Sequence, residues 1–147
     1  AKIMDAPEVL AGACIDAGAD IVTVMASAPV ATVRKVIALA HARGKEAFVD
    51  LLGVSDLESR AAYFDELGAD YLCIHASKNE KTPPFEPFAA ARAVVRNAKL
   101  AVAGGITTAN IAQVMALHPD VVIVGSGIYQ AEDPAAEIAR FKEAMTQ

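Results

Sequence analysis

Four ionisable side chains occupy positions where an active site could form. Asp50 closes the apolar run "AFVD" and His75 closes "YLCIH", while Lys2 and Asp5 lie in the opening segment "AKIMDA". A histidine at a strand end can accept or donate a proton near neutral pH, and a lysine beside it can stabilise developing negative charge. A carboxylate at a strand end needs polar or charged neighbours, because burying an unpaired carboxylate costs free energy. These residues predict proton-transfer chemistry. The alternative for His75 is a structural role, with its hydrogen bonds satisfied by neighbouring residues. The alternative for Lys2 and Asp5 is that they are free charged residues near the terminus.

Two glycine-containing segments indicate an anion site. "VAGGITTAN" places Gly104 and Gly105 at the end of one apolar run, and "VIVGSGIY" places Gly125 and Ser126 at the end of the next. Glycine lets a backbone approach a ligand closely, and free N–H groups at a helix start attract anions. Two such segments on consecutive strands fit the phosphate site of many βα barrels. They predict phosphate binding; the alternative is a pair of tight turns that need glycine for their own geometry.

Composition and charge narrow the class of protein. The 147 residues are 54% hydrophobic and 21% charged, as expected for a single domain over residues 1–147. The formal net charge of −5 argues against nucleic acid or an anionic membrane as the main partner. The apolar runs are shorter than the roughly 20 residues that a membrane span needs, and no secretory leader opens the sequence. Cys14 and Cys73 have neither metal-ligand nor disulfide spacing, which predicts free thiols in the cytoplasm.

Short apolar runs alternate with amphipathic stretches along the whole chain. The runs lack strict alternation, as do strands that are covered on both faces of a parallel sheet. One strand-and-helix unit recurs about every 25 residues, and "DAGADIVTV" and "ELGADYLCI" are near repeats. This pattern predicts an α/β fold, either an open flavodoxin-like sheet of five strands or the larger part of an eight-stranded TIM-type barrel. The expected strands are 19–25, 45–52, 69–76, 99–105 and 120–127, and the expected helices are 7–17, 30–43, 57–67, 85–96, 109–117 and 134–145.

Two local expectations concern the segments after strands. The polar, proline-rich segment 77–87, "SKNEKTPPFEP", follows a strand directly, where parallel α/β folds keep active-site loops. A solvated surface loop is the alternative. Thr107 or Thr108 is placed to cap the helix that follows the first glycine pair.

These residues resemble those of the hexulose-6-phosphate synthases, a family in the orotidine-monophosphate decarboxylase group of phosphate-binding βα barrels. The similarity runs along the whole chain and includes "KIMDA", "AGADIVTV", "FVDLLGVSDLESRA", "GADYLCIH", "AVAGGI" and "PDVVIVGSGIYQAEDPA". It implies an eight-stranded TIM barrel whose strands four to eight lie in this sequence. In the family the third strand ends in Asp-x-Lys-x-x-Asp, so the first aspartate of that motif would precede Ala1. We therefore expect the missing strands to come from further residues or a second chain, because open apolar edges invite aggregation.

The resemblance also implies an activity. Enzymes of this family are aldehyde-lyases that join formaldehyde to ribulose 5-phosphate, giving hexulose 6-phosphate in the ribulose monophosphate pathway of formaldehyde fixation. A proton leaves the ketose, and Mg²⁺ and a lysine hold the resulting enediolate while it attacks the aldehyde. The family's metal ligands, a glutamate on strand two and the first aspartate of the motif, have no counterpart in this sequence.

By the same resemblance the protein is a homodimer, and each implied site residue has a role. Lys2 contacts the enediolate, Asp5 reaches into the partner subunit's site, and His75 transfers the proton. The implied catalytic residues are thus Lys2, Asp5, Asp50 and His75, and the implied phosphate-binding residues are Gly104, Gly105, Gly125 and Ser126.

Two other hypotheses stay open. The sister 3-keto-L-gulonate-6-phosphate decarboxylases carry glutamate at the position of Asp50 and threonine at that of Ala103, so both residues favour the synthase. After His75, however, "ASKNEKTPP" lacks the Thr-Gly usual in the synthases, and Lys78 stands where the decarboxylases have arginine. The third hypothesis is a non-catalytic, phosphate-binding part of a barrel.

Overall fold

The protein forms one parallel β-sheet in a computed structural model that describes residues 1–77 and 83–145. The described residues contribute six strands, which are hydrogen-bonded in the order in which they occur along the chain. Every neighbouring pair is parallel. The strands are β1 (Lys2–Ile3), β2 (Ile21–Met25), β3 (Glu46–Asp50), β4 (Tyr71–His75), β5 (Lys99–Ala103) and β6 (Val121–Ile123).

Helices follow the strands and return the chain to the same end of the sheet. They are α1 (Pro7–Asp16), α2 (Val30–Ala42), α3 (Leu57–Glu66), α4 (Phe85–Val94) and α5 (Ile111–Met115), and after β6 come α6 (Ser126–Tyr129) and α7 (Pro134–Met145). Within the described residues, every helix is too short or too polar to cross a membrane.

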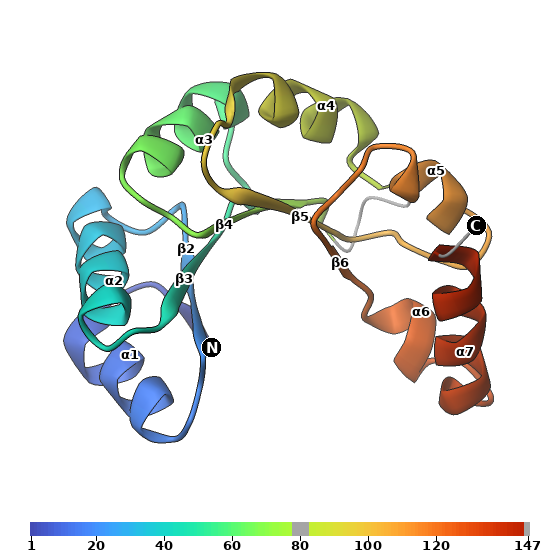
Figure 1. Cartoon of the computed structure of the whole chain (residues 1–147), viewed down its shortest axis with the longest axis horizontal. Coiled ribbons are helices and arrows are strands. Elements are labelled where there is room, and N and C mark those ends of the chain that lie inside the picture. Colours follow the sequence, from blue (N-terminus) through green and yellow to red (C-terminus); the bar gives the residue numbers. More distant parts are fainter. Residues whose placement is uncertain (78–82, 146–147) are drawn as a thin grey trace.

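The strands curve in an arc, and the helices lie along its outer side (Figure 1). The sequential strand order confirms the barrel-type prediction and excludes the flavodoxin-like sheet, whose strand order reverses within the sheet. In the described part of the chain, β1 and β6 are the two ends of the sheet and do not pair with each other, so the arc is not closed. The expected completion of the barrel stays a prediction.

The observed strands differ from the expected ones at both ends of the sheet. The apolar runs did not predict β1, although the family motif implied the end of a third strand at Lys2; its two residues pair with Thr23 and Val24, so the edge of β2 is partly covered. A two-residue strand is too short to produce a recognisable pattern. The last strand ends at Ile123 rather than at position 127, because the chain turns at Gly125 into α6.

Two loop expectations are also corrected. Neither threonine caps α5: Asn110 occupies the N-cap position, and no side chain caps this helix. Thr108 instead donates its hydroxyl to the Glu137 carboxylate, 3.1 Å away. Of the segment 77–87, residues 78–82 lie outside the described part of the chain, and α4 already begins at Phe85. The comparison of Lys78 with the arginine of the decarboxylases therefore also lies outside the described residues.

Both faces of the sheet are apolar along much of its length, which explains the unbroken apolar runs in the sequence. Strand side chains alternate between the two faces. The outer face packs against the helices, and Phe64 of α3 and Phe88 of α4 are fully buried there. The strand residues of this outer layer include Val22, Val24, Val49, Leu72, Ile74, Leu100 and Val102. The inner face carries Phe48, Tyr71, Cys73, Ala101 and Ala103.

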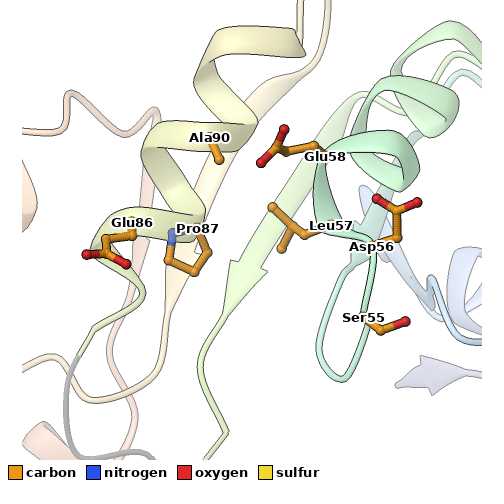
Figure 2. Close-up of a pocket in the computed structure, with 7 residues that line it drawn as sticks. All are labelled: Ser55, Asp56, Leu57, Glu58, Glu86, Pro87 and Ala90. Atoms are coloured by element: carbon orange, nitrogen blue, oxygen red, sulfur yellow. The ribbon is translucent and has the colours of Figure 1, made fainter.

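Helices α3 and α4 pack together and leave an open pocket between their first turns (Figure 2). Its volume is about 430 Å³. It contains none of the predicted catalytic or phosphate-binding residues, so it is a separate feature of the outer surface. Its lining residues are Ser55, Asp56, Leu57, Glu58, Glu86, Pro87 and Ala90.

Asp65, near the end of α3, ties this helix to the turn before β5. Its buried carboxylate accepts backbone N–H groups from Ala98 at 2.6 Å, Arg96 at 2.8 Å and Asn97 at 3.0 Å. Burial by itself raises the pKa of Asp65, but these donors lower it more, and the net pKa lies below its ordinary value. The carboxylate therefore stabilises the fold above the ordinary carboxyl pKa, and this contribution is lost as the pH falls through the folded-state pKa.

We expect Asp65→Asn to lower the free energy of unfolding by about 3 kcal/mol at neutral pH, because an NH₂ group replaces one acceptor oxygen and faces an N–H donor that it cannot bind. It should also flatten the loss of stability in acid, since the group that titrates is gone. Urea denaturation at neutral and acid pH measures both effects. Asp16→Asn is the control: this carboxylate is exposed beside Arg43, and its loss should cost less than about 1 kcal/mol. Equal losses in the two variants would contradict the prediction.

Candidate active site

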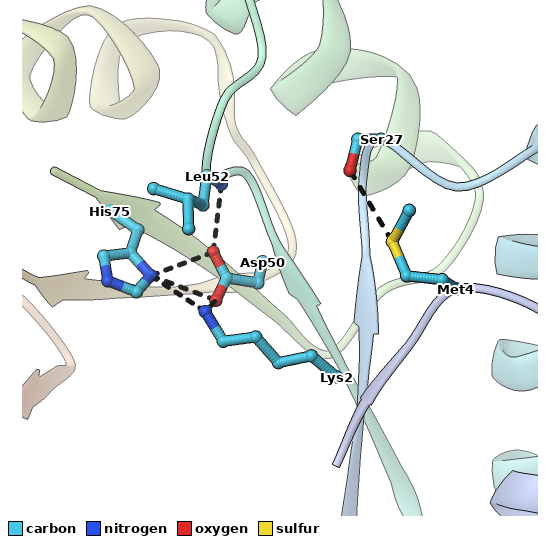
Figure 3. Close-up of polar contacts among 6 residues, drawn as sticks. All are labelled: Lys2, Met4, Ser27, Asp50, Leu52 and His75. Carbon is cyan, nitrogen blue, oxygen red and sulfur yellow. Dashed lines mark hydrogen bonds and ion pairs between the residues drawn. The ribbon is translucent and has the colours of Figure 1, made fainter. Parts of the chain in front are cut away.

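Asp50 is the centre of a polar group at the carboxyl end of the sheet. Only 3% of its side chain is exposed. The carboxylate lies 2.7 Å from Lys2 Nζ and 3.1 Å from His75 Nδ1, and it accepts the N–H of Leu52 at 3.0 Å. Figure 3 shows the side chains of Lys2, Asp50 and His75 converging from three different strands. The structure thus brings together three of the four predicted catalytic residues.

The register of the strands explains why these side chains meet. Asp50 pairs with Cys73 across β3 and β4, so both side chains lie on the inner face of the sheet. His75 follows two residues later on the same face, at the last position of β4. Lys2 lies in β1, opposite Thr23 of β2, and its long side chain reaches past β2 to the carboxylate. Because parallel strands align their ends, residues about 25 positions apart in sequence become neighbours.

Asp50 is held in its ionised form. Its burial raises the pKa, but the hydrogen bonds from His75, Lys2 and the Leu52 N–H together outweigh burial, and the pKa lies below its ordinary value. A fixed negative charge therefore sits between an ammonium group and an imidazole. This charge orients both groups.

The contacts of His75 decide which ring nitrogen faces outward. Nδ1 lies 3.2 Å and 3.1 Å from the two Asp50 oxygens and 3.4 Å from Lys2 Nζ. Because a carboxylate only accepts hydrogen bonds and is the closer neighbour, we assign the proton of the neutral ring to Nδ1. Nε2 then carries the lone pair, and His75 can act as a base through that atom.

Among residues 1–77 and 83–145, Asp50, Cys73 and His75 are the group whose ligand atoms lie close enough to hold a metal ion, all within 4.8 Å of one another. This group does not fit Mg²⁺, which prefers oxygen ligands in an octahedral arrangement. It offers one carboxylate, which already pairs with the Lys2 ammonium. Burial and the neighbouring Asp50 charge raise the pKa of the Cys73 thiol, which keeps that group protonated.

The two glycine segments come together at the ends of β5 and β6. Gly104 and Gly105 have φ values of +93° and +66°, which other residues rarely adopt. A Cβ on Gly104 would lie 2.2 Å from the carbonyl oxygen of Ala76, the residue after His75. A Cβ on Gly127 would lie 2.7 Å from the carbonyl oxygen of Ile106, so the two glycine segments touch. The segments therefore form one backbone surface beside His75.

Asp5 is the predicted residue that the structure leaves outside this group. It lies exposed in the bend before α1, and the contacts that join Lys2, Asp50 and His75 do not involve it. Its predicted role in a neighbouring subunit stays a prediction. Sequence reasoning in turn missed Cys73 as a neighbour of Asp50, although its position two residues before His75 places both on one face.

Comparison with known proteins identifies the family. Residues 1–141 match the Orotidine 5'-phosphate decarboxylase / HUMPS family. The chain is 40% identical over 147 residues to 3-hexulose-6-phosphate synthase 3 of Staphylococcus saprophyticus, covering 98% of this chain and 70% of the relative. The crystal structure of 3-hexulose-6-phosphate synthase from Salmonella typhimurium superposes with a TM-score of 0.93 at 38% identity, covering 99% of this chain and 71% of that one.

A sister enzyme shares the fold at lower identity. The structure of 3-keto-L-gulonate-6-phosphate decarboxylase from Vibrio cholerae superposes with a TM-score of 0.79 at 21% identity, covering 97% of this chain and 68% of that one. Identity at this level shows the fold alone. The match of the family over almost the whole chain and the identity to the synthases carry the assignment. The chain belongs to the orotidine 5'-phosphate decarboxylase and hexulose-phosphate synthase family, a family of lyases with a TIM-barrel fold.

Proposed function

We propose that the protein is an aldehyde-lyase that condenses formaldehyde with ribulose 5-phosphate to give hexulose 6-phosphate. The observation that carries this proposal is the contact of Lys2, Asp50 and His75 at the end of the sheet, beside two touching glycine segments. A base, a cation and a backbone anion site are the groups that an enediolate reaction on a sugar phosphate needs.

The three side chains divide the chemistry among them. Nε2 of His75 takes a proton from C1 of the ketose, and the electron pair of that C–H bond moves into an enediolate. The Lys2 ammonium, 46% exposed and therefore accessible, stabilises the negative charge on the enediolate oxygens. C1 then forms a bond to the carbon of formaldehyde, and the new alkoxide takes the proton back from His75. Asp50 keeps the imidazole oriented and balances its charge while it is protonated.

The glycine segments supply the other half of the site. In this proposal the backbone N–H groups of Gly104, Gly105, Gly125 and Ser126 bind the phosphate group, which anchors the sugar with its carbonyl end toward His75. The residues that would hold the Mg²⁺ implied by the family resemblance have no counterpart in this sequence, and the Asp50 group does not fit the ion, so these steps use only residues of this chain.

The synthase is favoured over the decarboxylase by two positions on the inner face. Asp50 is shorter than the glutamate of the sister enzymes, and Ala103, paired with His75 in the sheet, is smaller than their threonine.

Two further proposals, on oligomeric state and on location in the cell, rest on exposed apolar side chains and on the cysteines. Val9 and Leu10 of α1 are 70% and 43% exposed, which supports a homodimer contact there. The free thiols of Cys14 and Cys73 support a cytoplasmic protein.

The test is an assay of the purified native protein with ribulose 5-phosphate and magnesium, with and without formaldehyde. We expect consumption of ribulose 5-phosphate only when formaldehyde is present, with hexulose 6-phosphate as the product identified by mass spectrometry. A matched reaction with 3-keto-L-gulonate 6-phosphate tests the decarboxylase. Release of carbon dioxide there, with no formaldehyde-dependent reaction, would replace the synthase by the sister activity. Inactivity in both assays would favour the non-catalytic hypothesis.

A further inference from the structure

We propose that Asn110 is a positioning residue that holds the turn from Gly104 to Thr107 in its phosphate-binding shape. This inference rests on the proposed function, since it concerns the same phosphate site. Both functional ends of the Asn110 side chain contact the turn. Its Nδ2 donates to the carbonyl oxygen of Gly105 at 2.9 Å, and its Oδ1 accepts the N–H of Thr107 at 2.9 Å.

The direction of these bonds separates Asn110 from an ordinary helix cap. A capping asparagine accepts N–H groups from the helix that follows it. Asn110 occupies the N-cap position of α5, but its side chain makes no such bond and points back to the preceding turn. The side chain therefore acts on the turn that leads into the helix, where the Thr107 carbonyl oxygen accepts the N–H of Ile111.

The start of the turn needs such a restraint, because its glycines do not fix the backbone as the buried Ile106 does further along. Gly104 and Gly105 both have positive φ values, and glycine has the largest conformational freedom to lose. They carry no side chains that could anchor the segment. The Gly105 carbonyl belongs to the peptide that follows the proposed phosphate-binding N–H, so the bond from Asn110 restrains the backbone next to the ligand.

The surrounding contacts confine the effect of Asn110 to this turn. Thr108 is held separately, because its hydroxyl donates to Glu137 of α7. On the other side, Ala76 donates its N–H to Ala103, which fixes the end of β5. Removing the Asn110 amide thus loosens the segment between these two anchors, which includes Gly104 and Gly105 of the proposed phosphate site.

The test compares Asn110→Ala with Asn97→Ala in the native protein. Asn97 lies in the turn at the other end of β5 and donates its side-chain amide to Asp65, so the control removes a similar bond far from the site. We expect Asn110→Ala to raise both the KM for ribulose 5-phosphate and the inhibition constant of inorganic phosphate by about 10-fold or more, as two lost hydrogen bonds imply. The kcat should change by less than about threefold, because the catalytic group is untouched. Asn97→Ala should change none of these values.

A purely structural role would give a different pattern. It would lower the melting temperature and the fraction of active protein while leaving KM and the phosphate inhibition constant unchanged, and that result overturns the proposal. A second measurement needs no variant: the Thr107 N–H should be protected from hydrogen exchange in the wild-type protein. A freely exchanging Thr107 amide also overturns it.

The same design separates this inference from the proposed function. If the wild-type protein fails to consume ribulose 5-phosphate with formaldehyde, the proposed function fails. Titration calorimetry with inorganic phosphate on wild type and Asn110→Ala still tests the turn. Weaker phosphate binding by the variant supports the role of Asn110, and equal binding contradicts it.

Discussion

Replacing His75 with glutamine is expected to lower kcat by about 10²–10⁴-fold, because glutamine keeps a hydrogen-bonding side chain but cannot take up a proton. The side chain of His75 is 23% exposed and contacts Asp50 and Lys2, so the substitution removes the base and preserves much of the volume. Exchange of the C1 proton of ribulose 5-phosphate in D₂O, without formaldehyde, isolates the proton-transfer step. This exchange should fall by the same factor as kcat.

The matched control is His41→Gln. His41 also pairs with a carboxylate, Asp70, at 2.8 Å, but this pair lies at the amino end of the strands, where Asp70 accepts the N–H of Ala47. The control removes a histidine–aspartate pair of the same kind at the opposite end of the sheet, so kcat and proton exchange should stay within about twofold of wild type. Wild-type exchange in His75→Gln, or an equal loss in both variants, would remove His75 from the role of base.

Gly104→Ala is expected to cost about 3–5 kcal/mol of the free energy of unfolding, which is large for the addition of one methyl group. Two effects add. The φ of +93° strains any residue with a Cβ, and that Cβ would lie 2.2 Å from the Ala76 carbonyl oxygen, which is backbone and cannot rotate away. Because Ala76 follows His75, the forced shift should also lower kcat.

Gly18→Ala measures the conformational effect alone. Gly18 has an almost equal φ of +95°, but a Cβ there meets nothing within 4 Å, so we expect a loss of only about 1–2 kcal/mol. The difference between the two variants is the cost of the contact with Ala76. Thermal or urea denaturation of both variants measures it, and a 147-residue chain should show a gap of several degrees in Tm. Equal stability of the variants would show that the segment after β5 moves freely away from β4.

Much of this protein could be predicted from the sequence, because its signals are local. Apolar runs that recur about every 25 residues predicted the parallel α/β fold, and the helix bounds were correct to within a few residues. Asp50 and His75 were predicted at strand ends because each closes an apolar run. The family resemblance, carried by quoted motifs, added the barrel and the likeness to the synthases, which the comparisons confirm.

Other features depend on contacts between residues far apart in the chain, and a local pattern cannot encode these. The sequence alone left an open sheet and a barrel as alternatives, and the strand order decided between them. The pairing of Lys2 with Asp50 depends on β1, whose two residues acquire strand geometry only by pairing with β2. The side chain of Asn110 points back to the Gly105 carbonyl instead of capping α5. The sequence therefore determined which residue types stand at the strand ends, and tertiary structure alone decided which of them touch, because register and side-chain direction are fixed only when the strands pair.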